Sequence, residues 1–409
     1  MSNPSYDILI TGGGMAGASL ACALKRSGLS VAVIEAVAPE TGQQPGYDDR
    51  TVALGHGSWR ALQALGIDLP PATAIEHIHI SEKGGFGITR IDHREENVVA
   101  LGHVVENRAF GDSLWRQMKD ADNIDIITPA TVTDLTQYIN QVVVIIDGEG
   151  GRREISARLL VIADGGRSAA REAAGFRFRQ KPYGQTAIVA NISTDRGHEH
   201  TAWERFTGDG AIALLPMTQQ RYSLVWSVPD RRVESLLQLP DGAFLRELRE
   251  GFGDRCGRFT EVGKRASYPL FLSRVSSPVS GRTALVGNAS CSMHPVAGQG
   301  FNRGLRDVGA LAELVHEAGL CGDDPGSESL LKAYQSRRRF DDRLTTTYTD
   351  SMIRTFSTPF PPLKLARNLG LAGVSLIPGL RHELASLSMG EHARLPRLRH
   401  NIPENCHGQ

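Results

Sequence analysis

The sequence predicts an α/β fold: a Rossmann-like dinucleotide-binding domain with an inserted β-rich domain and a helical C-terminal region. The prediction rests on a buried strand that runs into a glycine-rich helix start, on two stretches of strand-like alternation, and on helical periodicity late in the chain. We expect the first domain over 1–74, 102–180 and 275–325, the insert over 75–101 and 181–274, and the helical region over 326–409.

The first stretch is a strand over 7–11, the motif GGGMAG over 12–17, a helix, and a second strand over 31–34 that ends in Glu35. Glycines let the turn tighten and the backbone approach a pyrophosphate, and an acidic residue after the second strand can accept from a ribose hydroxyl. The motif's glycines are Gly12, Gly14 and Gly17. The pattern does not distinguish FAD from NAD, and a helix–strand turn with incidental glycines is the alternative.

The second stretch is ADGGRS, which follows an apolar strand over 159–162 and contains Asp164 and Gly165. Open α/β sheets bind ligands at the carboxyl ends of their strands, which favours a site here. An ordinary Asp-Gly turn is the alternative.

The third stretch, GNASCSMHPVAGQGFNRGLRD, covers 287–307 between a buried strand and a helix expected over 302–317. Gly298 and Gly300 allow close backbone approach, and the helix start presents unpaired N–H groups. Such a site suits a flat, anionic partner such as a reduced flavin, whereas a glycine-rich connection that only packs is the alternative. His294 suggests a catalytic base, but a loop histidine before proline is more typically structural.

Composition excludes some classes of function. Positive and negative residues balance at 45 each, which gives no support for nucleic-acid binding. The cluster 337–339, followed by Asp341 and Asp342, indicates a solvated helix face. Five widely spaced cysteines without a C-x-x-C pair favour a reduced cytosolic compartment over a disulfide framework or a zinc site, and we expect no metal.

One late segment, 359–380, is apolar, carries the cations Lys364 and Arg367, and contains no acidic residue. It is too short and too interrupted for a spanning helix, but it suits a helix that lies in the membrane interface. Packing on the protein's own domain or on a second subunit is the alternative.

In this order the three stretches resemble the class A flavin monooxygenases of the para-hydroxybenzoate hydroxylase fold, over nearly the whole chain. Four segments are similar to those of the ubiquinone-biosynthesis hydroxylases, and among them the 2-polyprenyl-6-methoxyphenol hydroxylases: GYDDRTVAL (46–54), VVENR (104–108), ERFTGDGAIALLPM (204–217) and HPVAGQGFNRGLRD (294–307). Asn288 departs from the wider family, where aspartate accepts from a ribityl hydroxyl, although asparagine keeps an acceptor oxygen.

The resemblance implies a set of FAD-binding residues. Glu35 would bind the adenosine ribose, Arg108 the ADP portion, and Asp164 with Gly165 the phosphate region. Arg50, at the end of a loop, is a candidate for the pyrophosphate or the ring, with a surface ion pair as the alternative. The residues expected to face the isoalloxazine are Gly298, Gln299, Gly300, Phe301 and Asn302.

The resemblance also implies a reaction. NAD(P)H as co-substrate would reduce FAD, and O₂ would give a flavin C4a-hydroperoxide that hydroxylates a polyprenylated methoxyphenol in ubiquinone biosynthesis. His294 and Arg50 are the catalytic candidates, although this chemistry does not require a base. The alternatives are another phenolic substrate, a non-catalytic flavin-binding scaffold subunit, and a simple NAD-dependent dehydrogenase.

The same implied substrate suggests where the protein works. We expect a cytoplasmic protein, with either peripheral contact at the inner membrane surface or contact with other ubiquinone-biosynthesis proteins. The sequence does not decide whether the protein forms a homo-oligomer.

Overall fold

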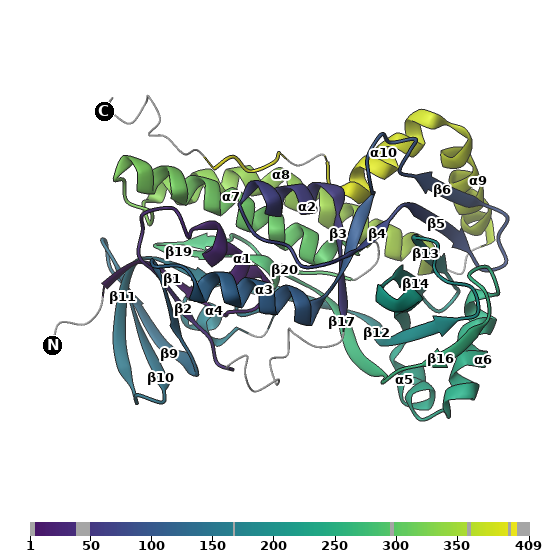
Figure 1. The fold of residues 1–409 in the computed structure, drawn as a ribbon, viewed down its shortest axis with the longest axis horizontal. Coiled ribbons are helices and arrows are strands. Elements are labelled where there is room, and N and C mark those ends of the chain that lie inside the picture. Colours follow the sequence, from purple (N-terminus) through teal and green to yellow (C-terminus); the bar gives the residue numbers. More distant parts are fainter. Residues whose placement is uncertain are drawn as a thin grey trace.

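The computed structural model describes residues 5–37, 50–166, 168–294, 298–357, 361–391 and 394–398. Two large sheets lie at opposite ends of an elongated molecule, and the long helices α7 (Gln299–Cys321) and α8 (Glu328–Ser357) run between them (Figure 1). This arrangement places the start of α7 where the two halves meet.

Sheet 1, the eight-stranded sheet, contains the strands of the dinucleotide-binding unit in the order β18-β19-β11-β1-β2-β8. The five strands from β19 to β8 pair in parallel, while β10 pairs antiparallel with both β11 and β9. Its strands are β1 (Ser5–Thr11), β2 (Val31–Ile34), β8 (Ile124–Ile127), β9 (Ala130–Gln137), β10 (Val142–Gly148), β11 (Arg153–Ile162), β18 (Val279–Ser280) and β19 (Thr283–Leu285).

Both faces of sheet 1 are covered, which explains the continuous apolar runs of its central strands. Ile8 and Ile10 of β1 pack on one face with α1 (Met15–Ala23), α3 (Asn107–Lys119) and α7. Leu9 points to the other face, where β9, β10 and α4 (Ala169–Ala173) form a second core. The carboxyl ends of β1, β2 and β11 therefore open onto one edge, where the glycine-rich loops begin.

Sheet 2, the nine-stranded sheet, has the order β20-β17-β12-β15-β14-β13-β5-β6, with β16 paired to β12. Helices α5 (Asp230–Leu237) and α6 (Asp241–Phe252) cover one face. The other face packs against α8, α9 (Pro361–Leu376) and α10 (Pro378–Met389) (Figure 1). Its strands are β5 (His77–Glu82), β6 (Ile88–Asp92), β12 (Phe178–Thr194), β13 (Thr201–Phe206), β14 (Ala211–Pro216), β15 (Tyr222–Pro229), β16 (Phe259–Val262), β17 (Ala266–Val275) and β20 (Cys291–Ser292).

A three-stranded sheet, in the order β3-β7-β4, connects the two halves. Its strands are β3 (Thr51–Gly55), β4 (Thr73–Ile75) and β7 (Gly102–Glu106), and α2 (His56–Ala64) follows β3 directly. At the far end, α9 is anchored to β5 because Glu82 accepts from Arg367 at 2.6 Å and from Asn368 at 2.7 Å. These side chains are buried, so the anchor fixes which face of α9 points outward.

The predicted elements differ from the structure mainly at their ends. The helix expected from 302 begins three residues earlier, at Gln299. The sequence patterns do not predict helices α5 and α10 or strand β13. Pro216 ends β14, which lies between β13 and β15 in sheet 2.

Candidate functional site

The three glycine-rich stretches meet around one cleft of about 620 Å³ at the carboxyl ends of β1, β2 and β11. Each stretch follows a different strand of sheet 1, and parallel pairing brings the loops after these strands to the same edge. The predicted cofactor residues that line the cleft are Gly12, Gly14, Glu35, Asp164, Gly165, Asn288, Gly300 and Phe301.

The glycines of the first motif have different positions. Gly12 has a positive φ of 92°, and a Cβ there would lie 2.7 Å from Cα of Asp164. A Cβ on Gly17 would run into the carbonyl of Gly12. A Cβ on Gly14 would meet no protein atom within 4 Å, and Gly14 lines the cleft. Gly12 and Gly17 therefore hold the backbone together, while Gly14 leaves space for a ligand.

Glu35 stands directly after β2, at the rim of the cleft, as the spacing predicts. Its carboxylate accepts from the backbone N–H groups of Gly13 at 2.5 Å and Val37 at 3.0 Å. Trp115 of α3 supports the same turn, since its indole N–H donates to the carbonyl of Gly13 at 3.1 Å. The turn is therefore held from both sides, and the ribose contact of Glu35 stays a prediction.

Asp164 provides an acceptor that is unused within the described part of the chain. Its Oδ1 is buried and has no hydrogen-bond partner there, and burial raises the pKa of its carboxyl to about 6. A buried acceptor without a donor is costly unless a ligand supplies one. This fits a hydroxyl-bearing ligand such as the ribityl or ribose part of FAD.

Arg171 joins the second stretch to the third. Its guanidinium is buried and donates to the carbonyl oxygens of Gly166 at 2.9 Å and Ala289 at 3.1 Å. The ring of Phe178 lies 4.2 Å below it. Arg171 follows Ser168, the end of the second stretch, by one turn in the sequence, but its partner in the third stretch is a long-range contact that spacing does not predict.

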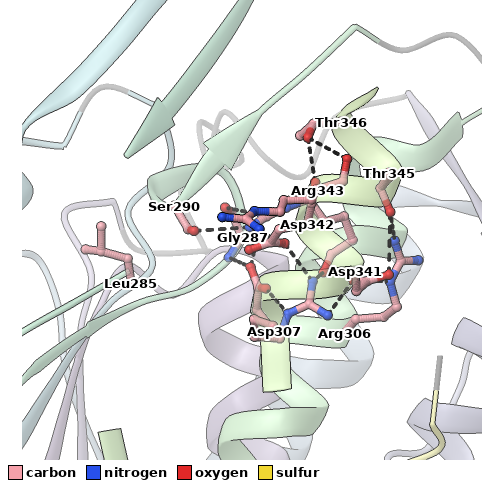
Figure 2. Close-up of polar contacts among 12 residues, drawn as sticks. Leu285, Gly287, Ser290, Arg306, Asp307, Asp341, Asp342, Arg343, Thr345 and Thr346 are labelled. Carbon is pink, nitrogen blue, oxygen red and sulfur yellow. Dashed lines mark hydrogen bonds and ion pairs between the residues drawn. The ribbon is translucent and has the colours of Figure 1, made fainter. Parts of the chain in front are cut away.

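The loop beside Asn288 is held from below by buried charges (Figure 2). Asp307 of α7 accepts from the backbone N–H of Gly287 at 3.0 Å. Arg303 pairs with Asp307 at 3.0 Å and donates to Ser290 at 3.1 Å. Arg303 and Asp307 are each only 1% exposed. Because every bond is charge-assisted and shielded from water, the loop that lines the cleft is held in place.

The same charges continue into α8 and correct one prediction. Arg338 is 3% exposed and pairs with Asp307 at 2.6 Å, Asp341 at 2.5 Å and Asp342 at 3.0 Å. Arg306 pairs with Asp341 at 2.9 Å. The expectation of a solvated helix face over 337–339 is therefore wrong at Arg338, because α7 packs on α8 and supplies the carboxylate that its guanidinium needs.

The first turn of α7 is braced to its neighbours. The amide of Asn302 donates to the carbonyl of Ala53 at 2.9 Å and accepts from the N–H of Gly55 at 2.9 Å. Gln299 donates to the carbonyl of Ser388 in α10 at 3.3 Å. The structure therefore directs these two side chains toward β3 and α10, whereas Gly300 and Phe301 line the cleft.

A second cavity, of about 100 Å³, lies on the other side of the α7 start, against sheet 2. Gly298 and Asn302 contribute to its wall, so it adjoins the segment predicted to face the flavin ring. Most of its lining is apolar: Ile75, Ile78, Ile80, Leu101, Ala202, Ala213, Leu215, Val225 and Met352. Among its described lining residues, Glu204 is the one that carries a formal charge.

Five predicted residues are not among those that line the cleft or this second cavity: Gly17, Gln299, Arg50, Arg108 and His294. The guanidinium of Arg50 lies 4.6 Å from the ring centre of Tyr268, and Arg108 is exposed in the first turn of α3. His294 is buried with Nε2 at 3.3 Å from Oε1 of Gln185, and burial lowers its pKa to about 4. These residues stay predictions, and His294 is neutral at physiological pH.

Some sequence expectations concern thiols, metals and membrane spans. Cys22, Cys256 and Cys291 are free and buried, whereas Cys321 is disulfide-bonded, which departs from the reduced state that the cysteine spacing favours. Sequence spacing does not reveal which thiols a fold brings together. Among the described residues, no group of three metal-ligating side chains gathers. Within the same ranges, no helix is long and apolar enough to cross a bilayer.

Comparison with known proteins identifies the family. A family model for an FAD binding domain matches residues 5–346. This chain belongs to the FAD-binding domain family. The family membership confirms the predicted FAD cofactor, and it is inconsistent with the alternative of a simple NAD-dependent dehydrogenase.

Relatives of similar length support a narrower placement. Ubiquinone hydroxylase UbiL of Rhodospirillum rubrum is 39% identical over 406 residues, covering 97% of this chain and 93% of that protein. The 3-demethoxyubiquinol 3-hydroxylase of Escherichia coli is 30% identical over 396 residues, covering 95% of this chain and 100% of that protein. The predicted resemblance to the flavin-dependent hydroxylases is confirmed.

Solved structures confirm the predicted α/β fold. The crystal structure of p-nitrophenol 4-monooxygenase PnpA from Pseudomonas putida has a TM-score of 0.78 and 17% identity, covering 94% of this chain and 98% of that one. The structure of OxyS anhydrotetracycline hydroxylase from Streptomyces rimosus has a TM-score of 0.72 and 21% identity, covering 96% of this chain and 77% of that one. At these identities the likeness concerns the fold.

Proposed function

We propose that this FAD-dependent hydroxylase acts on a polyprenylated methoxyphenol of ubiquinone biosynthesis, with NAD(P)H and O₂ as co-substrates. The observation that supports the proposal is the apolar second cavity. Gly298 and Asn302, at the start of α7, form part of its wall. An aromatic ring bound there would lie beside the segment expected to hold the flavin. The names of the relatives, which include ubiquinone hydroxylases, support this substrate class.

The cleft fits FAD in its chemistry. Gly14 and Gly300 leave open space where a side chain would stand, and Oδ1 of Asp164 lacks a donor within the described residues. Glu35 would hold the adenosine ribose, and Asn288 would accept from a ribityl hydroxyl. When bound, FAD supplies the redox chemistry that activates O₂ for transfer of one oxygen atom.

The chain's own part in the reaction is positioning and exclusion of water. The second cavity is small and mainly apolar, so a bound ring displaces water from the place where oxygen is transferred. The bracing of Asn302 to β3 and of Gln299 to α10 fixes the wall between cleft and cavity. Holding the flavin and the phenol ring close together in a fixed geometry can supply a large part of the rate enhancement of hydroxylation.

The proposal is tested with the purified protein, its bound FAD and a soluble, short-chain methoxyphenol. We expect the phenol to stimulate NAD(P)H oxidation, and mass spectrometry to show a product with one additional oxygen derived from ¹⁸O₂. A non-catalytic scaffold subunit would bind FAD but show no phenol-stimulated oxidation, which would overturn the proposal.

For the membrane, we propose a peripheral contact at the cytoplasmic side of the inner membrane through the outer face of α9 and α10. Five residues there are large, apolar and about half exposed or more: Leu365 55%, Leu369 56%, Leu376 81%, Ile377 51% and Leu380 48%. Arg367 faces inward to Glu82, so it is not one of the cations expected to meet lipid, whereas Lys364 is exposed. Phe86 in the β5–β6 turn is 62% exposed, and the neighbouring Gly84 lies near Lys364.

A Leu365→Asp, Leu369→Asp double variant tests this contact in a sedimentation assay with anionic vesicles. We expect the intact protein to pellet with vesicles and the variant to stay in solution. The variant replaces two apolar side chains that would enter the membrane interface with negative charges that anionic lipid repels. Both leucines are more than half exposed, so the variant should keep its fold and FAD. Phe340→Asp, at a residue of α8 that is 76% exposed, is the matched control. Intact protein that stays in the supernatant would instead favour delivery of the substrate by a partner protein.

A further inference from the structure

A hollow of about 420 Å³ lies between one side of α8 and the end of β17 with the segment that follows it. Ser290, Cys291 and Arg303 form its buried part. None of the described residues that line it also lines the cleft or the second cavity. The loop that borders the cleft at Asn288 borders the hollow two residues later, at Ser290, so the two spaces are separate neighbours.

The lining of the hollow is strongly basic. One described lining residue, Asp342, is an anion. The cations are Arg274, Arg303, Lys332, Arg339 and Arg343. Asp342 is already used, since it pairs with Arg303 at 2.9 Å and with Arg338 at 3.0 Å. Lys332 pairs with Glu328 at 2.6 Å. An excess of positive charge therefore remains around the hollow after the described ion pairs are counted.

Three of these arginines have no carboxylate partner in the part of the chain that the structure describes: Arg274, Arg339 and Arg343. Arg339 and Arg343 are exposed and stand four residues apart on α8, where like charges on one side of a helix are unfavourable. Arg274 is exposed at the end of β17, on the facing wall. The fold gains nothing from three such charges around one space, so their convergence favours an anionic ligand.

A second observation comes from the buried end of the hollow. Arg303 is 1% exposed, and its Nε is buried without a hydrogen-bond acceptor among the described residues. Its other guanidinium nitrogens donate to Asp307 at 3.0 Å and to Ser290 at 3.1 Å. A buried donor that lacks an acceptor costs free energy, and an anion in the hollow would bring acceptor oxygens to Arg303.

The charges also indicate the size of the anion. One phosphate group carries a charge of at most about −2, which three guanidinium groups exceed, whereas two linked phosphate groups balance them. Guanidinium groups bind phosphate oxygens in a bidentate manner, and the hydroxyls of Ser276 and Ser336 on the walls can donate further hydrogen bonds. We propose that the hollow binds two linked phosphate groups, either as free pyrophosphate or as the diphosphate of a nucleotide. This site goes beyond the proposed function and does not depend on the phenolic substrate.

The first test is isothermal titration calorimetry on the wild-type protein saturated with FAD, so that the cleft is already filled. The probes are inorganic pyrophosphate, inorganic phosphate and ADP. We expect pyrophosphate to bind about tenfold or more tightly than phosphate, because it can reach arginines on both walls. Tighter binding of ADP than of pyrophosphate would assign the site to a nucleotide, and the reverse order would assign it to the free anion.

The second test compares the wild-type protein with an Arg339→Gln, Arg343→Gln double variant. Loss of two charge-assisted contacts should weaken pyrophosphate binding by about tenfold or more. The matched control is an Arg116→Gln, Arg246→Gln double variant, which removes the same two charges from exposed positions on α3 and α6 outside the hollow. The control should bind pyrophosphate as the wild-type protein does. Neither variant changes a residue that lines the cleft, so FAD content should be the same in all three proteins.

Each outcome decides the assignment. Wild-type protein that binds no pyrophosphate, or that binds phosphate equally tightly, overturns it. Equal weakening in both double variants would show that the overall charge of the protein attracts the anion, and would also overturn it. Weaker pyrophosphate binding in the Arg339→Gln, Arg343→Gln variant alone, with FAD content unchanged, would support a phosphate site that is separate from the FAD cleft.

Discussion

Gly14 and Gly300 are positions where a side chain should block the cofactor without disturbing the fold. Both line the cleft, and a Cβ at either position would have no protein atom within 4 Å. Gly14 has φ −67° and ψ 177°, which is extended backbone open to any residue, and Gly300 is in the first turn of α7. We therefore expect Gly14→Val and Gly300→Val to fold normally.

The magnitude follows from packing. If FAD lies against these backbones, the added carbons must displace it, and inserting carbons into a close contact costs about 1–3 kcal/mol. That corresponds to a loss of roughly 5- to 150-fold in FAD affinity. Stability of the FAD-free protein should change by less than about 1 kcal/mol, since no new contact within the protein is created.

Fluorescence titration of the FAD-free variants with FAD, together with urea denaturation, measures both quantities. Gly17→Val is the contrasting control, because its Cβ would run into the carbonyl of Gly12 and should destabilise the protein with or without FAD. If Gly14→Val and Gly300→Val both keep wild-type affinity, FAD does not lie where the cleft places it.

Three further predictions concern charged and polar groups. Asp307→Asn leaves Arg303 and Arg338 buried without their shared carboxylate, so urea denaturation should show a loss of about 3–5 kcal/mol, whereas Asp254→Asn, in an exposed pair, should show no measurable change. Burial raises the pKa of Asp164 from 3.8 to about 6, so folding favours the protonated carboxyl. The resulting contribution to the free energy of unfolding is complete below pH 3.8 and is lost as pH rises through 6. Thermal denaturation of the FAD-free proteins should therefore show wild type losing stability relative to Asp164→Asn as pH rises across that range. A difference in melting temperature between the two proteins that stays constant with pH would contradict this. Asn288→Asp should preserve or tighten FAD binding in a fluorescence titration, and weaker binding would argue against the ribityl contact.

The residues of the cleft could be predicted because each belongs to a local pattern. Gly12, Gly14 and Glu35 are set by one strand–turn–helix–strand unit, and Asp164 by the end of a single strand. Parallel pairing then brings these local units to one edge of sheet 1 without further information. The sequence also predicts Asn302 among the residues beside the cofactor, but it does not show that the side chain bonds to β3.

The missed groups depend on contacts between distant segments. Arg338 looks solvated in sequence because its neighbours are charged, but its partner Asp307 lies on α7 and becomes adjacent only when the two helices pack. Glu204 belongs to a strand that was not predicted, and its orientation is set by pairing with Ile80 of β5, far away in the chain. Packing of helices and long-range strand pairing decide both cases, and neither leaves a periodic signal.

The first turn of α7 links the two cavities mechanically. On the cleft side, Asp307 and Arg303 hold the backbone of Gly287, one residue before Asn288. On the other side, Asn302 holds β3, which contributes to the wall of the second cavity. All three side chains come from the same helix within six residues, 302 to 307, so the helix cannot shift relative to one cavity without shifting relative to the other. If flavin binds in the cleft and the substrate ring in the second cavity, as proposed, one rigid element would set their separation, which is the condition under which positioning can contribute to catalysis.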